Sequence, residues 1–278
     1  MFGKLMKHEW RATVMAQGGL CAAILSLGLL GAVNVAIIYK KAEQISNLAM
    51  GSLSLSLLFI NLAILLCAAA SGILLLVRFY KSRFTDQGYL TFTLPVTVHQ
   101  NFLSAFLNML RWQVLVFVAL VLAYGFMALG IYLAIGRETF REFYEPLRLL
   151  FAEEMNDVLQ SMAMLVPAYV LQLIVGVVYN TMIALTCLTL GATLAKKHKI
   201  LAAIGVYYLI STATGMVGNA LTMSVTLRLE EVLQGTEVEA LRQVMQQLLT
   251  VTLPLQLLVI GLCYVLATTF MKKKLNLN

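Results

Sequence analysis

Six apolar stretches that contain no Lys, Arg, Asp or Glu dominate this chain of 278 residues. A hydrocarbon core about 30 Å thick is crossed by about 20 apolar residues in a helix. Because lipid offers the backbone no hydrogen-bond partner, each stretch is predicted to be helical. The chain is therefore predicted to be an all-α polytopic membrane protein with six transmembrane helices. The predicted spans are Gly18–Tyr39, Leu48–Val77, Trp112–Gly136, Val158–Ala195, Ile200–Leu227 and Leu248–Met271.

Composition and the placement of charge agree with this interpretation. The chain has 60% apolar and 12% charged residues, and this composition excludes a soluble enzyme and a disordered chain. The net charge of +7 does not indicate a nucleic-acid partner, because the basic residues are sorted by side of the membrane. One side receives 13 of the 20 Lys and Arg residues, and the positive-inside rule places that side in the cytoplasm. Both termini are then predicted to be cytoplasmic.

The first 17 residues are predicted to form an amphipathic helix in the cytoplasmic interface, in contact with membrane lipid. Cations such as Lys4, Lys7 and Arg11 lie opposite an apolar stripe. An elbow near Gly18 and Gly19 would lead into the first span. The stripe consists of Phe2, Leu5, Met6, Trp10, Thr13 and Val14.

Residues 78–111 form the long cytoplasmic connection, which mixes basic, aromatic and turn residues. Thr97 and Gln100 have the spacing of a capping box, which predicts a helix that starts after Thr97. Before Gly88, the segment Arg78–Thr85 is predicted to form a short helix that exposes Phe79, Arg83 and Phe84 to the cytoplasm. The alternative is an interfacial loop anchored by aromatic and cationic side chains, which these features alone slightly favour.

Two external segments, residues 137–157 and 228–247, are predicted to contain amphipathic helices on the outer leaflet. Pro146 suits the first position of one helix, and Thr236 with Glu239 forms a second capping box. These helices either cover the bundle or contact substrate.

Catalytic and metal-binding patterns are missing from the sequence. The four cysteines lie in apolar spans without ligand spacing, and His8, His99 and His198 are isolated from one another. No phosphate-binding Gly-rich loop with Lys and Ser or Thr is present, so the chain itself is not expected to be an ATPase or other enzyme. The spans contain no acid, which argues against an ion-coupled secondary transporter.

Uncharged polar side chains do occur within the spans. They either form helix contacts, which is the usual role of amides in membranes, or line a pathway. A pathway of this kind would suit an amphipathic peptide, a lipid or a hydrophobic drug. The candidates are Asn34, Asn61, Gln172, Asn180, Asn219 and Gln256.

The order of these parts resembles the permease subunits of type-2 ABC exporters. The stretch Asp86–Thr97 is similar to the segment after the second span in permeases of Gram-positive bacteria. The resemblance implies a bacterial plasma-membrane location and a coupling segment that docks on a separate ATPase, with Phe79, Arg83 and Phe84 filling a groove, supported by Asp86 and Tyr89. It also implies two ATPase subunits that bind ATP and Mg²⁺, and a second permease chain, identical or homologous. The alternative function is a membrane sensor or accessory subunit that pairs with an ATPase without moving substrate.

Overall fold

The structure is a computed structural model that describes residues 2–40, 46–85, 88, 96–136, 141, 145, 156–195, 197–230 and 237–275. Within these ranges, only the backbone is described for residues 156–165, 225–230, 237–248 and 273–275.

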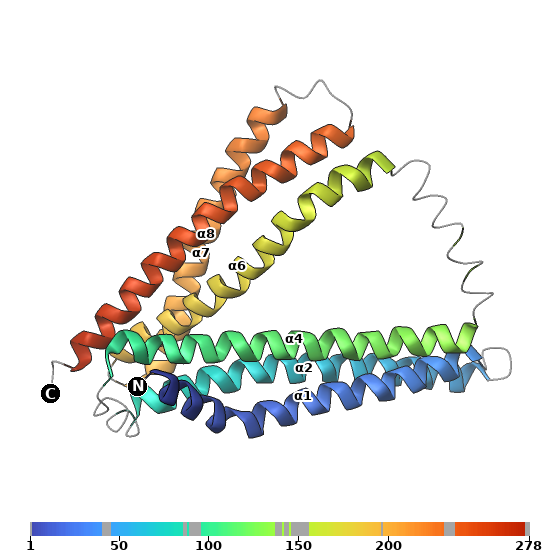
Figure 1. Cartoon of the computed structure of the whole chain (residues 1–278), viewed down its shortest axis with the longest axis horizontal. Helices are drawn as coiled ribbons and strands as arrows, with labels where there is room; N and C mark the ends of the chain where they lie inside the picture. Colours follow the sequence, from blue (N-terminus) through green and yellow to red (C-terminus); the bar gives the residue numbers. More distant parts are fainter. Residues whose placement is uncertain are drawn as a thin grey trace. The chain divides into compact units, whose positions relative to one another are not determined.

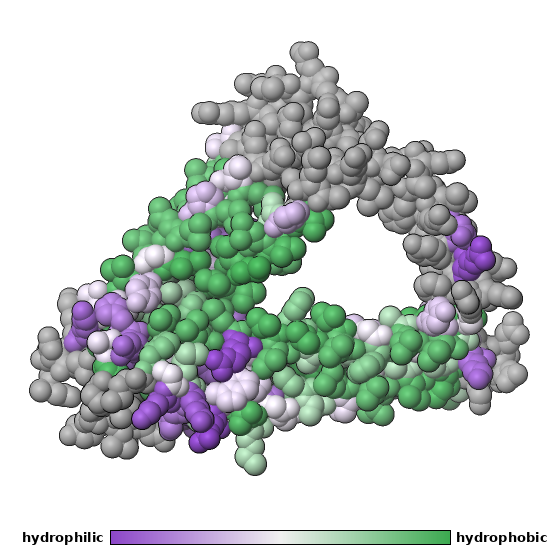
Figure 2. Space-filling view, viewed as in Figure 1, coloured by the Kyte–Doolittle hydropathy of each residue, from purple (hydrophilic) through white to green (hydrophobic). Residues whose placement is uncertain are grey.

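The described residues form long helices and no strand (Figure 1). Six helices are long and apolar enough to cross a membrane, which confirms the predicted all-α polytopic fold. Hydrophobic residues cover the middle of the helices, and hydrophilic residues gather toward the ends of α1, α2 and α4 (Figure 2). The helices are α1 (Phe2–Lys40), α2 (Asn47–Phe84), α4 (Val98–Ile135), α6 (Asn156–Leu194), α7 (Lys199–Glu230) and α8 (Glu237–Leu275).

The helices are longer than the apolar stretches, and three predicted breaks do not occur. Helix α1 continues through Gly18 and Gly19, although its first turns run in a different direction from the rest of the ribbon (Figure 1). Arg78–Phe84 is the end of α2 rather than a separate short helix. Residues 237–248 belong to the same helix as the last span. The two Gly residues cost helix stability without ending a helix, since the hydrogen-bond ladder can pass through them. Most of residues 137–157 lie outside the described residues.

The chain divides into two compact units, each made of helical segments. The first unit contains residues 1–77 and 107–152, and the second contains residues 78–106 and 153–278. Helices α2 and α4 therefore contribute residues to both units.

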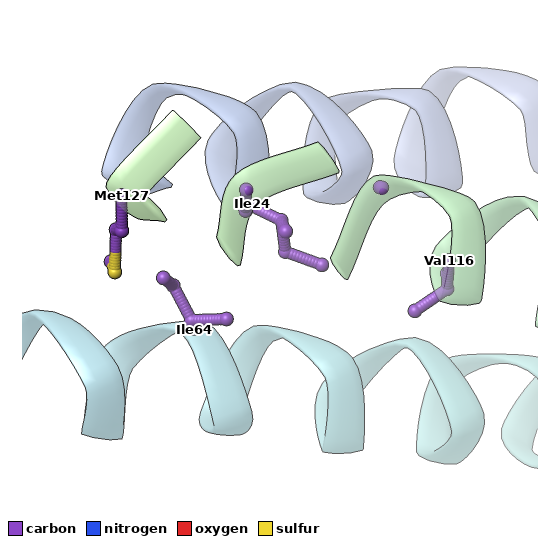
Figure 3. Close-up of a cluster of buried hydrophobic side chains, with 6 residues drawn as sticks. Ile24, Ile64, Val116 and Met127 are labelled. Atoms are coloured by element: carbon purple, nitrogen blue, oxygen red, sulfur yellow. The ribbon is translucent and has the colours of Figure 1, made fainter. Parts of the chain in front are cut away.

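In the first unit, α1, α2 and α4 surround one apolar cluster (Figure 3). Ile24 comes from α1, Ile64 from α2, and Val116 and Met127 from α4. From Ile24 to Val35 the buried positions of α1 recur in steps of four, three and four residues, which is the seam of a coiled coil. This seam includes Gly28, and a Cβ there would lie 2.6 Å from the Cα of Ala123. Backbone contact between α1 and α4 therefore depends on this glycine.

In the second unit, α6 packs against both α7 and α8. The Tyr179 hydroxyl donates to Thr214 Oγ1 on α7 at 3.0 Å, and Thr186 Oγ1 donates to the Cys263 carbonyl on α8 at 3.2 Å. A Cβ at Gly191 would lie 2.4 Å from the backbone nitrogen of Ala203. Helix α6 is the central helix of this unit, and 44% of an 18-residue apolar window within its span is buried.

We predict that Gly28→Ala lowers the free energy of unfolding by about 1–3 kcal/mol, because the added methyl group forces α1 and α4 apart. The matched control is Gly125→Ala on α4, where a Cβ has no neighbour within 4 Å. Thermal unfolding in lipid nanodiscs measures both variants. Equal unfolding temperatures for the two variants would contradict the close contact.

Candidate functional site

The end of α2 and the start of α4 form a cluster around a buried guanidinium group. Arg83 is 1% exposed, and its Nη2 donates to the carbonyl of Asn101 at 3.0 Å. Its Nη1 donates to Ser82 Oγ at 2.7 Å, and its Cζ lies 4.9 Å from the centre of the Phe79 ring. The guanidinium therefore joins the last turns of α2 to the first turns of α4 through hydrogen bonds and a cation–π contact.

Aromatic rings extend this cluster from α2 through α4 to α8. Phe79 packs edge-to-face on Phe84 and on Phe102, with ring centres 5.9 and 6.3 Å apart. Phe102 in turn contacts Tyr264 of α8 at 5.8 Å, and His99 Nδ1 lies 3.0 Å from the Tyr264 hydroxyl. We call Phe79, Arg83, Phe84, Phe102 and Tyr264 the Arg83 cluster. Because edge-to-face contacts fix ring orientation, the cluster holds three helices in one arrangement.

The connection that leaves this cluster starts and ends with defined turns. The backbone N–H of Gly88 donates to the Thr85 carbonyl at 2.7 Å, and a Cβ at Gly88 would lie 2.5 Å from the Arg83 carbonyl oxygen. At the other end, the Gln100 N–H donates to Thr97 Oγ1 at 3.2 Å, and the Thr97 N–H donates to Gln100 Oε1 at 3.3 Å. This reciprocal pair confirms the predicted capping box and the start of α4 after Thr97.

The predicted exposure of Phe79, Arg83 and Phe84 is wrong. The two rings are 2% and 4% exposed, so none of the three side chains is available to fill a groove on another protein. These three side chains are buried because α2 pairs with α4 at this point. The spacing of residues in the sequence does not reveal that pairing. Asp86 and Tyr89, the other two predicted coupling residues, lie outside the described residues.

The predicted pathway residues are not brought to one place. Asn61 and Asn180 donate to carbonyls of their own helices, at 2.8 and 2.9 Å. Asn34 donates from Nδ2 to Ser56 Oγ, which is a contact between α1 and α2. Among the described residues, the buried Oε1 atoms of Gln172 and Gln256 have no hydrogen-bond partner. Asn219 is exposed on α7. Asn34 therefore supports helix contact, and Asn61 and Asn180 are paired within their own helices. Gln172, Gln256 and Asn219 keep capacity for a further hydrogen bond.

A second polar cluster, in the first unit, was not predicted. The rings of Trp10 and Trp112 stack with centres 4.5 Å apart, and Arg111 lies over Trp10 at 4.9 Å. Trp112 Nε1 and Asn108 Nδ2 both donate to Thr13 Oγ1, at 2.9 and 3.4 Å. The chain has only two tryptophans, and they could have indicated this cluster from the sequence. A buried indole needs a partner for its N–H group. This cluster joins α1 to α4.

Farther along α1, the buried Gln17 exchanges two hydrogen bonds with Ser71 of α2. The face of α1 buried before the coiled-coil seam is thus Leu5, Glu9, Thr13 and Gln17. Leu5 and Thr13 belong to the predicted stripe, whereas Glu9 and Gln17 do not. The four-residue spacing of these buried positions rotates the buried face around the helix, because four residues advance more than one turn.

No group of three or more His, Cys, Asp or Glu residues suited to a metal ion occurs in the described part of the chain. Comparison with family models, with curated proteins and with solved structures finds no match.

We predict that Arg83→Met lowers the free energy of unfolding by about 2 kcal/mol, since a charge-assisted hydrogen bond to the α4 backbone is lost. Lys81→Met is the matched control, because Lys81 is two residues away on α2 and exposed. Thermal unfolding in nanodiscs compares the stability of the two variants. Protease digestion of the connection between α2 and α4 compares how readily that connection is cleaved in each. Identical curves for the two variants would show that Arg83 does not hold these helices together.

Proposed function

We propose that the chain is the transmembrane subunit of an ATP-driven exporter of the type-2 ABC class, with ATP hydrolysed by a separate subunit. The observation that carries the proposal is the Arg83 cluster, which attaches the connection between α2 and α4 to three helices. An exporter of this class must pass movement of a soluble ATPase into transmembrane helices. A connection held by a buried guanidinium and interlocked rings can transmit such a movement.

In this mechanism Phe79, Arg83 and Phe84 are anchors rather than docking residues. A force on the connection acts first on Arg83 and the carbonyl of Asn101, and then on the Phe102 and Tyr264 rings. Because packed cores shift between discrete arrangements, a small displacement of the connection would move the ends of α2, α4 and α8 together. Asp86 and Tyr89 remain candidates for direct contact with the ATPase.

The exposed side chains beside the anchors supply the docking surface in this proposal. Lys81 and Thr85 are exposed on the last turns of α2, and Thr97 and His99 are exposed at the start of α4. Of these, His99 also contacts Tyr264 of the cluster. An amphipathic peptide, a lipid or a hydrophobic drug is the proposed substrate class, because the polar groups within the spans are uncharged.

We predict that Lys81→Glu combined with Thr85→Glu weakens copurification with an ATPase encoded beside this chain by about tenfold, because two anions then replace one cation and one neutral side chain on the proposed docking surface. Lys40→Glu is the control, since Lys40 is exposed at the far end of α1. Copurification after coexpression, followed by ATP-dependent uptake into inverted vesicles, measures assembly and transport. Intact assembly without transport of any candidate substrate would favour a sensor, and unchanged binding by the double variant would refute this docking surface.

The bacterial plasma membrane is the proposed location, with both termini in the cytoplasm. We predict that a single cysteine replacing Glu237 reacts with an impermeant maleimide in intact cells, whereas one replacing Lys197 reacts only after permeabilisation. The asymmetry in basic residues is the reason for this orientation. Labelling of the Lys197 position in intact cells would reverse the topology.

A further inference from the structure

The first turns of α1 carry exposed cations on the side opposite their buried residues. Leu5 and Thr13 are among the residues of these turns that are buried. At 100° per residue, Lys4, Lys7 and Arg11 lie within about 60° of one another on the other side of the helix. All three are exposed, and we call them the α1 basic face.

A further cation, Arg111 of α4, is held beside this face. Its Cζ lies 4.9 Å from the centre of the Trp10 ring, which is itself stacked on Trp112. Trp10 is next to Arg11 in the helix and less than one turn from Lys7, and all of these residues belong to the first unit. Arg111 is exposed, and within the described residues its N–H groups have no hydrogen-bond acceptor. The stacked rings therefore fix the guanidinium group and leave its donors available.

The rest of the chain does not supply anions to balance these cations. Successive spans run in opposite directions, so the segments that share a side with the start of α1 are residues 78–111, 195–199 and 272–278. With the first 17 residues they hold 13 basic residues and two acids, Glu9 and Asp86. Glu9 is buried, and Asp86 lies outside the described residues. The second unit contributes nine of the basic residues and one acid, so in any placement it adds net positive charge on this side. The balancing anions therefore come from outside the chain.

The surface that continues the α1 basic face along the helix is apolar. Val14 and Met15 follow Arg11 within about one turn, flank the same side of α1, and are 40% and 90% exposed. A change from cations to apolar side chains within one turn is typical of a helix at the boundary between lipid phosphates and acyl chains. Stacked tryptophans also favour this depth of a membrane. An acidic soluble protein would cover the cations but leave Met15 in water, so the arrangement favours a lipid.

We propose that the α1 basic face and Arg111 bind the phosphate of an anionic membrane lipid, whose acyl chains lie along Val14 and Met15. The fork of N–H donors on Arg111 matches phosphate oxygens, and Lys7 and Arg11 add charge on the neighbouring helix. A phosphatidylcholine headgroup carries its own cation, which these side chains repel. The site therefore selects lipids by net charge, which is more than general contact with a bilayer. The inference is independent of the exporter proposal.

Tryptophan fluorescence tests the site directly, because Trp10 and Trp112 are the only tryptophans of the chain. The full-length chain is placed in vesicles of phosphatidylcholine and phosphatidylglycerol in equal amounts, with bromine on the acyl chains of one lipid at a time. Bromine quenches an indole that it contacts, so the ratio of the two quenching values gives the lipid preference at the site. We expect phosphatidylglycerol to be preferred about tenfold. Equal quenching by the two lipids, or quenching by neither, would overturn the proposal.

Variants then assign the preference to the named cations. Arg111→Gln is expected to lower it about fivefold, which is the effect of one basic charge at a membrane surface. Lys7→Gln together with Arg11→Gln is expected to abolish it, and this variant leaves the contact between Arg111 and Trp10 in place. Lys40→Gln is the matched control, because Lys40 is exposed at the far end of the same helix.

Two further outcomes would refute the lipid site. One is a preference for phosphatidylglycerol that survives in the Lys7 and Arg11 double variant. The other is a preference that falls equally in the Lys40 variant, since the effect would then be one of net charge alone. The vesicles contain no ATPase, so either outcome leaves the exporter proposal standing.

Discussion

A backbone in hydrocarbon can form hydrogen bonds only with itself, and much of this structure follows from that constraint. It explains why α1 remains helical through Gly18 and Gly19. It also explains the behaviour of hydroxyl groups within the spans. Thr186 and Thr189, for example, donate to carbonyls four residues earlier in their own helix, at 2.8 Å in both cases. Polar residues are thereby accommodated without a partner helix.

Contacts between helices then depend on the few positions where two backbones or two polar groups meet. In the first unit these are Gly28 against Ala123, and the hydrogen bonds that Trp112 and Asn108 donate to Thr13. In the second unit, the buried Arg83 connects α2 to α4. Charge, aromatic rings and a backbone carbonyl are combined there because a buried guanidinium is stable only when its N–H groups have acceptors. The same cluster links the connection to α8 through packed rings, which is the property that the proposed coupling to an ATPase requires.

The proposed coupling concerns the ends of α2 and α4, which belong to the second unit together with α6, α7 and α8. Helix α6 joins the other helices of this unit, since it contacts α7 through Tyr179 and α8 through Thr186. Tyr264 of α8 also belongs to the Arg83 cluster, so a movement of the connection between α2 and α4 would pass through α8 to α6.

Hydropathy predicted the six spans and the helical class, and the capping-box spacing predicted the start of α4 after Thr97, because lipid thickness and helix capping act locally along the chain. The burial of Phe79, Arg83 and Phe84 could not be predicted in this way. A basic and aromatic segment has the same local pattern whether it faces water or another helix, and only the pairing of α2 with α4 decides between them. The buried stripe of α1 likewise depends on which face meets α4 and Ser71. Local chemistry therefore determines which segments are helices, and contacts between residues distant in the chain determine which of their faces are inside.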